Sequence, residues 1–312
     1  MMKGKDLLTI EQLSAQEIDL ILQKASALKK FQKEGISHKF MEGKNLAMIF
    51  HKASTRTRVS FEAGFSQMGG HALYLDSAST QMGRGEPIKD TARVLSRYVD
   101  AVMIRTFSQE SVEEFAHYCD KPVINGLTDY AHPCQALADI MTAYEKLGEL
   151  KNKKFVFIGD GNNVANSLIF TCAKIGMNIT VSAPAGYQPD DKIIFSAKEI
   201  AKKSGSKVEI EIDPFKAALN ANVLYTDVWA SMGQESEREK RINDFKKYKI
   251  DETLLDKADK DCIVMHCLPA HRGEEIEDNV MEGKHSAIFD EAENRLHVQK
   301  AIMVLLMTDA EF

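Results

Sequence analysis

Short apolar runs alternate with helix-spaced apolar residues along most of this chain, and no other feature constrains its fold as strongly. Two such series occur, the second opening at Lys154. The expected strands are 45–50, 71–75, 101–105, 155–158, 178–182, 223–227 and 262–266. The expected helices are a first one, capped by Ser14 and Glu17 and ended by Gly35, and then 59–68, 88–98, 135–147 and 164–175. Alternation of this kind predicts α/β architecture, with parallel sheets flanked by helices.

The chain length favours two domains, since 312 residues exceed what a single core usually fills. We expect one domain over 1–138 and a second over 139–290, with the helical segment 135–147 linking them. The segment 291–307 has the pattern of an amphipathic helix. We expect this helix, within 291–312, to pack back on the N-terminal domain, because an exposed apolar stripe would favour aggregation.

Composition excludes several classes of protein. A net charge of −6 disfavours binding to bulk nucleic acid, which requires a basic face. The five cysteines are dispersed and form no C-x-x-C pair, so they do not indicate a disulfide framework. The longest apolar segment, Ala301–Met307, is too short to span a bilayer, and the N-terminus lacks an apolar run typical of a signal peptide. We therefore expect a cytoplasmic protein that binds neither membranes nor nucleic acid.

A cluster of hydroxyl and guanidinium side chains directly follows the first predicted strand. It reads Ser54-Thr55-Arg56-Thr57-Arg58 and opens a helix. Free N–H groups and a partial positive charge at a helix N-terminus favour a phosphate, and these side chains add donors of suitable geometry. A capped helix with exposed arginines is the alternative interpretation, but the density of donors after a buried strand favours an anion site.

This cluster, followed by Ser60-Phe61-Glu62, resembles the carbamoyl-phosphate signature of the aspartate/ornithine carbamoyltransferase family. Further motifs follow in the family's order along nearly the whole chain. They are Gln81-Met82-Gly83-Arg84-Gly85-Glu86, Arg105, His132-Pro133-Cys134-Gln135-Ala136-Leu137-Ala138-Asp139, Gly159-Asp160-Gly161-Asn162-Asn163, Asp227-Val228-Trp229-Ala230-Ser231-Met232-Gly233, His266-Cys267-Leu268-Pro269 and Phe289-Asp290-Glu291-Ala292-Glu293-Asn294-Arg295.

Two of the motifs resemble the ornithine branch of this family, namely Ser231-Met232-Gly233 and the His-Cys-Leu-Pro run that contains Cys267. The resemblance implies transfer of the carbamoyl group of carbamoyl phosphate to the side-chain amine of ornithine, giving citrulline. It also implies a homotrimer with shared active sites, and neither a cofactor nor a metal. Putrescine, N-acetylornithine and aspartate are the alternative acceptors. The resemblance leaves open whether the enzyme serves arginine synthesis or catabolism.

The family's site residues carry over onto matching positions. The carbamoyl-phosphate set implied is Ser54, Thr55, Arg56, Thr57, Gln81, Arg105, His132, Pro133, Cys134, Gln135, Cys267, Leu268 and Arg295, with Gln81 reaching a neighbouring subunit's site. The ornithine set implied is Asn163, Asp227, Ser231 and Met232. The catalytic set implied is Arg105, His132, Asp227 and Cys267.

Three of these segments also admit other interpretations. The run Gly159-Asp160-Gly161 follows a predicted strand, as in the dinucleotide-binding turn of an NAD(P)-dependent oxidoreductase. Two features disfavour that interpretation: the third glycine of the fingerprint is missing, and the next strand does not end in an acidic residue. A Cys267–His266 dyad is disfavoured because neighbours on a strand point to opposite faces. The Cys/His spacing around these residues matches no common zinc site. His132 could be a buried structural histidine, and a non-catalytic binder remains the third alternative.

The acceptor amine must lose its proton to attack, although a free alkyl ammonium has a pKa near ~10.4. A carboxylate beside the reacting amine would hold that proton in place. We therefore expect Asp227 to bind the α-ammonium group of ornithine and the reacting amine to lie near Cys267. The departing phosphate can then accept the proton.

Overall fold

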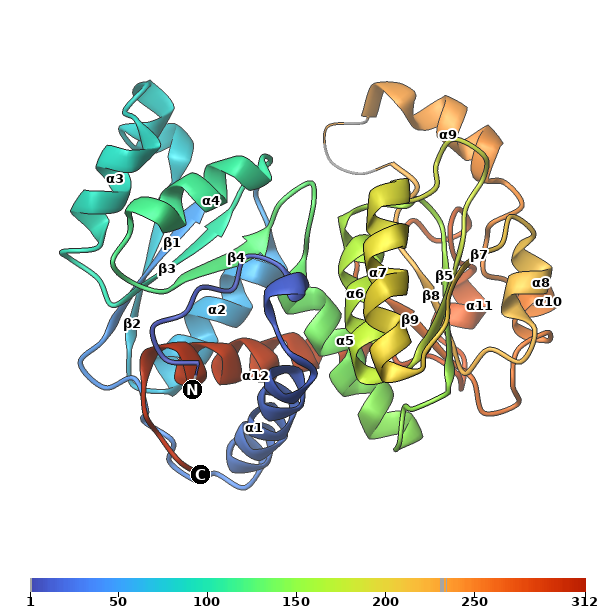
Figure 1. Cartoon of the computed structure of the whole chain (residues 1–312), viewed down its shortest axis with the longest axis horizontal. Helices are drawn as coiled ribbons and strands as arrows, with labels where there is room; N and C mark the ends of the chain where they lie inside the picture. The colour runs from blue at the N-terminus through green and yellow to red at the C-terminus, as the bar shows by residue number, and fades with distance from the viewer. Residues whose placement is uncertain (1, 231–232, 234) are drawn as a thin grey trace. The chain divides into compact units, whose positions relative to one another are not determined.

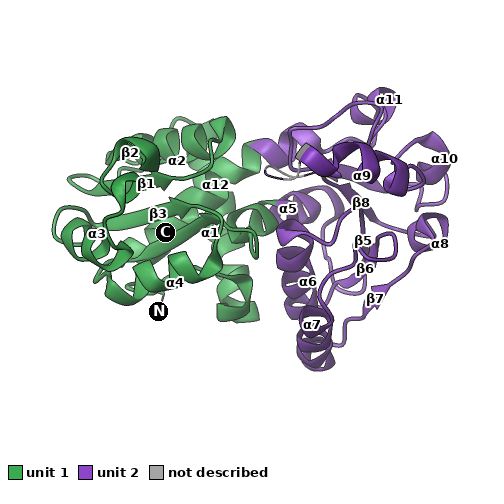
Figure 2. Ribbon diagram, turned by 90° about the horizontal axis from the view of Figure 1, so that it is seen from above, with its two compact units in different colours: residues 1–138, 293–312 green, residues 139–292 purple. Residues whose placement is uncertain are grey.

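The computed structural model describes residues 2–230, 233 and 235–312. Its chain divides into two compact units, coloured separately in Figure 2: unit 1 comprises 1–138 and 293–312, and unit 2 comprises 139–292. Each unit contains one parallel sheet flanked by helices. The predicted α/β fold class is confirmed.

Unit 1 contains a four-stranded sheet in the order β2-β1-β3-β4, with every neighbouring pair parallel. Its strands are β1 (Asn45–Phe50), β2 (His71–Asp76), β3 (Ala101–Arg105) and β4 (Val123–Leu127), and its helices include α1 (Ala15–Lys33), α2 (Thr55–Gln67), α3 (Ile88–Leu95) and α4 (Gln109–Tyr118). In Figure 1, α3 and α4 cover one face of this sheet, and α1 and α2 lie on the other. Neither α4 nor β4 was predicted from the sequence.

Helix starts in unit 1 follow side-chain caps. Ser14 and Glu17 form a complete capping box at the start of α1. Ser54 caps α2 by accepting a hydrogen bond from the backbone N–H of Thr57. Helix α2 therefore starts at Thr55, four residues before the predicted start at Val59. The prediction was late because the apolar periodicity begins only after the polar first turn.

Unit 2 contains a five-stranded parallel sheet in the order β7-β6-β5-β8-β9. Its strands are β5 (Lys154–Ile158), β6 (Asn178–Ser182), β7 (Val208–Ile210), β8 (Val223–Thr226) and β9 (Ile263–His266). Its helices are α6 (Asn163–Ile175), α7 (Asp191–Ser204), α8 (Pro214–Ala218), α9 (Arg238–Phe245), α10 (Glu252–Leu255) and α11 (Asp278–Met281). Helices α6 and α7 lie on one face of the sheet, and α8 to α11 pack around a core that includes Leu224 and Phe245 on the other (Figure 1).

Two helices carry the chain across the unit boundaries: α5 (Pro133–Leu147) contains the first boundary and α12 (Ile288–Met307) the second. Within unit 1, Lys29 of α1 donates to Asn294 of α12 at 2.7 Å, and Gly64 of α2 lies so close to Leu296 that an added Cβ would be 3.2 Å from its Cδ1. The end of the chain therefore packs on the N-terminal part of unit 1, as expected.

The amphipathic character predicted for this last helix is wrong, because nearly all of its residues from 294 to 307 are buried rather than one face of it. Its polar side chains, such as the fully buried Lys300, find partners inside unit 1: Lys300 donates to Gln32 at 3.0 Å and contacts His38 Nε2 at 3.1 Å. A periodic pattern of polar residues is thus compatible with full burial when α1 and the segment after it supply hydrogen-bond partners.

Two polar segments, 77–86 and 234–249, lie outside the predicted strands and helices, and both contain short helices. Segment 77–86 includes the 3-10 turns Ser77–Ser79 and Met82–Arg84. Segment 234–249 includes α9, whose Phe245 is fully buried and belongs to the core of unit 2, so this segment is not merely a solvated surface element. Among the described residues, no helix is long and apolar enough to cross a membrane.

Candidate active site

The first group of predicted site residues gathers at the carboxyl ends of β1 and β3. The chain leaves β1 for β2 on one side and then continues to β3 on the other, which makes this the switch point of the sheet in unit 1. Ligands of open parallel sheets bind in the crevice that forms at such a point. Phe50 pairs with Arg105 in the register, and His51 donates its backbone N–H to the Arg105 carbonyl at 2.8 Å, so both strand ends meet here.

The N-terminus of α2 supplies backbone donors at this point. The Ser54 hydroxyl accepts from the backbone N–H of Thr57 at 3.2 Å. The other N–H groups of the first turn remain free for a ligand, and the helix dipole favours negative charge beside them. The two arginines of the cluster differ. Arg56 is half-buried on the first turn, whereas Arg58 pairs with Glu62 at 3.3 Å and stacks on Tyr74 at 3.8 Å. Arg58 therefore does not add its guanidinium to the anion site.

A buried hydrogen-bonded cluster lies beside this helix end. The hydroxyl of Thr57 accepts from Arg105 Nη1 at 3.3 Å and from Arg295 Nη2 at 2.9 Å, and Arg295 Nη1 donates to the Gln135 side chain. None of these four side chains is more than 6% exposed. Two buried guanidiniums sharing one neutral hydroxyl create a strongly positive environment, which suits a dianionic ligand.

His132 lies at the start of α5 near the same cations. Burial, together with the Arg295 and Arg105 guanidiniums, holds the pKa of His132 well below its ordinary value of 6.5. Its imidazole is therefore neutral at physiological pH and can donate one hydrogen bond without carrying charge. The following residue, Pro133, begins α5. Cys134 faces the core, where its thiol contacts the Asn125 carbonyl at 3.6 Å and burial raises its pKa to about 12.

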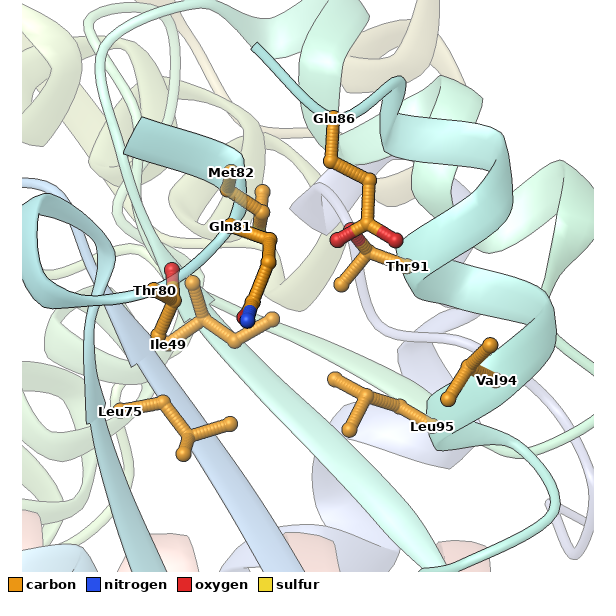
Figure 3. A pocket seen from close by; sticks show the side chains of 9 residues that line it. All are labelled: Ile49, Leu75, Thr80, Gln81, Met82, Glu86, Thr91, Val94 and Leu95. Atoms are coloured by element: carbon orange, nitrogen blue, oxygen red, sulfur yellow. The ribbon is translucent and has the colours of Figure 1, made fainter. Parts of the chain in front are cut away.

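Gln81 lies apart from these groups, in a pocket of about 180 Å³ formed under the 77–86 segment. Figure 3 shows its side chain pointing between Ile49 of β1 and Leu95 of α3. Glu86 closes another side of the pocket and accepts from Thr91 at 3.1 Å. Within one chain, Gln81 thus lines a largely apolar pocket.

The second group of predicted residues gathers at the switch point of unit 2, where β5 and β8 lie side by side. The turn after β5 contains Gly161, whose backbone N–H donates to the Tyr187 carbonyl at 2.8 Å. A Cβ added to Gly161 would lie 2.3 Å from the backbone nitrogen of Pro189. This glycine is required by the close approach of the 187–189 segment.

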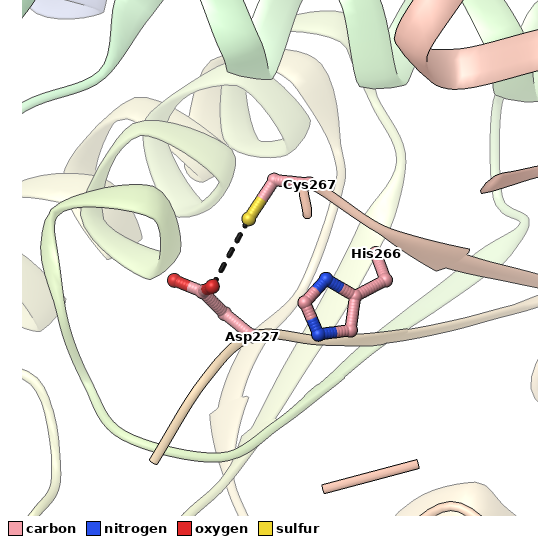
Figure 4. A group of neighbouring side chains, drawn as sticks. All are labelled: Asp227, His266 and Cys267. Carbon is pink, nitrogen blue, oxygen red and sulfur yellow. Dashed lines mark hydrogen bonds between the residues drawn. The ribbon is translucent and has the colours of Figure 1, made fainter. Parts of the chain in front are cut away.

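Asp227 and Cys267 meet at this edge of the unit 2 sheet. Asp227 follows β8 and Cys267 follows β9, and the Cys267 thiol donates to Asp227 Oδ1 at 3.1 Å (Figure 4). Asp227 Oδ1 also accepts from the Val228 N–H at 2.8 Å, and Oδ2 accepts from the Asn162 side chain at 2.7 Å. Asp227 is 7% exposed, so these donors stabilise a carboxylate that is nearly buried.

Asn162, which was not predicted as a site residue, connects two parts of this site. Its Oδ1 caps α6 by accepting from Val164 and Ala165, while its Nδ2 holds Asp227. An Asn before a helix signals a cap, but the sequence contains no signal for its second partner. Asn163 begins α6 directly after it. Ser231 and Met232 lie outside the described residues.

Cys267 is a protonated thiol rather than a nucleophile. Burial and the Asp227 carboxylate raise its pKa well above the ordinary 9.0, and Glu291 adds to the effect. His266 cannot activate it, because its ring is fully buried and both nitrogens are engaged: Nδ1 accepts from the Leu268 N–H at 2.9 Å and Nε2 pairs with Glu275 at 3.1 Å. The same two bonds leave no ring nitrogen for a metal at the Asp227, His266 and Cys267 cluster drawn in Figure 4.

Arg241 of α9 ties together the loops around Asp227. Its Nη1 donates to Asp160 of the turn after β5 at 2.8 Å and to the Trp229 carbonyl at 3.0 Å, and its Nε pairs with Glu237 at 3.1 Å. The guanidinium opposes the effect of burial, which raises the pKa of Asp160. Arg241 thereby connects α9 to the segment between Asp227 and the Ser-Met-Gly motif.

Two family descriptions match this chain. The family description "Aspartate/ornithine carbamoyltransferase, carbamoyl-P binding domain" matches residues 5–145, and "Aspartate/ornithine carbamoyltransferase, Asp/Orn binding domain" matches residues 151–306. Ornithine carbamoyltransferase of Anoxybacillus flavithermus is 53% identical over 306 residues, covering 98% of both chains, and the anabolic ornithine carbamoyltransferase of Pyrococcus furiosus is 52% identical over 309 residues, covering 99% of this chain and 98% of the relative.

Solved structures agree with these matches. The ornithine carbamoyltransferase structure from Pyrococcus furiosus superposes with a TM-score of 0.96 at 52% identity and covers 99% of each chain. The ornithine transcarbamoylase structure from Giardia lamblia, at only 32% identity, still reaches a TM-score of 0.89 with 99% of each chain covered.

Proposed function

The chain belongs to the aspartate/ornithine carbamoyltransferase family, and from this premise we propose which of its residues perform the reaction. The enzyme transfers the carbamoyl group of carbamoyl phosphate to the side-chain amine of ornithine, giving citrulline and phosphate. Similarity over nearly the full length to ornithine carbamoyltransferases carries this conclusion. In the reaction, an N–C bond forms to the carbonyl carbon, the C–O bond to phosphate breaks, and the amine proton leaves with the phosphate.

Carbamoyl phosphate binds in unit 1, with its phosphate at the N-terminus of α2. Ser54, Thr55, Arg56 and Thr57 supply hydroxyl, backbone and guanidinium donors there. Arg105 adds a second guanidinium from the end of β3, 6% exposed and therefore little screened by water. These donors bind the phosphate and stabilise the charge it gains as it leaves.

The carbonyl oxygen gains negative charge as the amine attacks, and three groups of unit 1 can stabilise it. Thr57 accepts hydrogen bonds from Arg105 and Arg295, so its own proton remains available to the substrate. His132 is neutral and can donate without competing with the arginines for the phosphate. Gln135 and Arg295, joined by their own hydrogen bond, hold the carbamoyl amide. The Pro133–Cys134 turn contributes only its backbone, since the Cys134 thiol faces the core.

Ornithine binds in unit 2. Asn163 holds the carboxylate, and Asp227 binds the α-ammonium group together with Ser231 and Met232. The reacting amine lies beside Cys267 and the Leu268 backbone. The protonated Cys267 thiol donates to Asp227, so one oxygen of that carboxylate is already occupied and is less able to hold a proton on the reacting amine.

The unit 1 sheet has an exposed edge that supports a homotrimer with shared sites. Strand β2 lies at this edge, with exposed Leu73 and Tyr74, and Val59 of α2 is also exposed. An edge strand with apolar side chains and unpaired backbone groups favours pairing with another chain. A neighbouring subunit at this edge would lie near the Gln81 segment, consistent with Gln81 serving the neighbour's site. The five free thiols support a reducing, cytoplasmic location.

The experiment that tests this function measures ureido product from purified protein and carbamoyl phosphate, with ornithine, N-acetylornithine, putrescine and aspartate in parallel. We expect product with ornithine alone. Product with another amine would keep the phosphate site but overturn the acceptor assignment. Activity in Arg105→Ala equal to that of the wild type at limiting carbamoyl phosphate would contradict the phosphate site itself.

A further inference from the structure

Two acidic side chains are completely buried behind Cys267 and Asp227 in unit 2. Asp139 belongs to α5 and Glu291 to α12, and both are 0% exposed. Their carboxyl groups lie within hydrogen-bonding range of each other. Neither residue belongs to the substrate-binding sets assigned above, so their burial beside the site needs a separate explanation.

A hydrogen bond between two carboxyl groups requires a proton, because two carboxylates have acceptors only. Two like charges in contact inside a protein would also repel each other strongly. Burial and the contact between the two carboxyls raise the pKa at which this pair, seen at Glu291, loses its last proton, which is consistent with a proton retained at neutral pH. Such a proton belongs to the pair as a whole.

The surrounding donors decide which carboxyl carries the proton. Glu291 Oε2 accepts from the His266 backbone N–H at 2.9 Å, and Oε1 accepts from the Tyr225 hydroxyl at 3.3 Å. An N–H and an O–H directed at both oxygens stabilise the ionised form of Glu291. Asp139 is then the protonated partner and donates to Glu291.

The two donors to Glu291 lie just before the site residues in the sequence. Tyr225 lies in β8, two residues before Asp227, and His266 is the last residue of β9, one residue before Cys267. Glu291 therefore connects the carboxyl ends of the adjacent strands β8 and β9. The 3.1 Å bond between Cys267 and Asp227 depends on the alignment of these same strand ends.

We propose that Asp139 and Glu291 are positioning residues that share one proton and fix the ends of β8 and β9, so that Asp227 and Cys267 meet the acceptor amine in register. A second negative charge in this pair would separate the carboxyls, release the Glu291 oxygens from β8 and β9, and place excess charge behind the amine site. The positioning role rests on the proposed ornithine site, whereas the shared proton does not.

The proton is tested first by infrared spectroscopy, without substrate. At neutral pH the wild type should show the carbonyl stretch of a protonated carboxylic acid, and Asp139→Asn should lose it. The control is Asp213→Asn, which changes the acid that caps α8 by accepting from Phe215 and Lys216, and which should retain the band. Absence of the band in the wild type, or its persistence in Asp139→Asn, overturns the shared proton.

Steady-state kinetics then test the positioning role. Asp139→Asn replaces the proton donor with an amide donor and should keep kcat and both KM values within about twofold. Glu291→Leu removes the acceptor of two strand-end donors and should lower kcat/KM for ornithine by about tenfold or more, since hydrogen bonds to charged groups are of that strength. The KM for carbamoyl phosphate should change less than that for ornithine, because most of the residues assigned to carbamoyl phosphate lie in unit 1.

Glu291→Gln keeps the shape of Glu291 and separates positioning from folding. It should lie between Asp139→Asn and Glu291→Leu in kcat/KM for ornithine, with a melting temperature near the wild type's. The proposal is overturned if Asp139→Asn and Glu291→Leu lose equal amounts of kcat/KM for ornithine. It is also overturned if Glu291→Leu changes the KM for ornithine and the KM for carbamoyl phosphate equally. A wild type that makes no citrulline would instead overturn the proposed function, and with it the positioning role, while the infrared band would still decide the proton.

Discussion

The hydroxyl of Thr57 provides the sharpest test of the unit 1 site. Thr57→Val preserves the shape of a side chain that is 1% exposed but removes the oxygen shared by Arg105 and Arg295. In the wild type, both acceptor positions of this oxygen are filled by guanidinium N–H groups, so its proton is the one donor left for the substrate carbonyl.

The expected loss follows from two separate effects. Removing one donor from a developing oxyanion costs roughly 2.7–4 kcal/mol in the transition state, or about 10²- to 10³-fold in kcat. Each guanidinium N–H left without its acceptor costs about 1–3 kcal/mol of stability. We therefore expect a large fall in kcat, a raised KM for carbamoyl phosphate, an unchanged KM for ornithine and a lowered melting temperature.

Initial rates of citrulline formation, measured while each substrate is varied, together with thermal melts, separate these effects. The control is Thr171→Val, which removes a fully buried hydroxyl that donates to the Ser167 carbonyl at 2.6 Å within α6. It should lower stability without lowering kcat. If Thr57→Val lowered the melting temperature but left kcat within about threefold of the wild type, the hydroxyl would have no role in the chemistry, and the oxyanion argument would be refuted.

Two further predictions concern other parts of the chain. Arg241→Met should raise the KM for ornithine by about tenfold, because Asp160 loses a charged donor. The matched change Arg238→Met, on the same helix but paired with Glu274, should leave this KM unchanged. Steady-state kinetics that show equal effects of the two changes would contradict the prediction. Glu17→Gln should lower the melting temperature at pH 7, by an amount corresponding to about 0.2–1 kcal/mol. The Lys5 ammonium and the Ser14 N–H lower the pKa of Glu17 to about 2 from 4.5, so this stabilisation is complete above the unfolded value and is lost as pH falls through about 2. Melts that differ equally at pH 7 and pH 2 would contradict the assignment.

Local features made much of the fold predictable from the sequence. Strands β1 and β3 were predicted with their observed bounds, because a buried parallel strand is a continuous apolar run with polar ends. Strand β4 was missed because Asn125 and Gly126 interrupt its run; Asn125 is nonetheless fully buried and donates to the Leu8 carbonyl at 2.8 Å. A tertiary partner of this kind leaves no trace in the local pattern.

The site was predictable where its residues form a compact motif and unpredictable where they act through contacts distant in sequence. The Ser54–Thr57 turn carries its chemistry in consecutive residues. Glu291 has its hydrogen-bond partners at positions 139, 225 and 266, and nothing at these positions alone predicts that they meet. The only local sign is an acid at Asp139 within an otherwise apolar stretch of α5.

The division of unit 1 into 1–138 and 293–312 also determines the order in which the protein can assemble as it is synthesised. Domains usually fold from the N-terminus as the chain emerges. Here the whole sequence of unit 2 emerges before that of unit 1 is complete, because unit 1 needs α12 to fill its core. Arg295 arrives with that helix, so the anion site is among the last features completed. Nascent chains stalled before residue 293 should therefore protect unit 2 from protease and leave 1–138 susceptible.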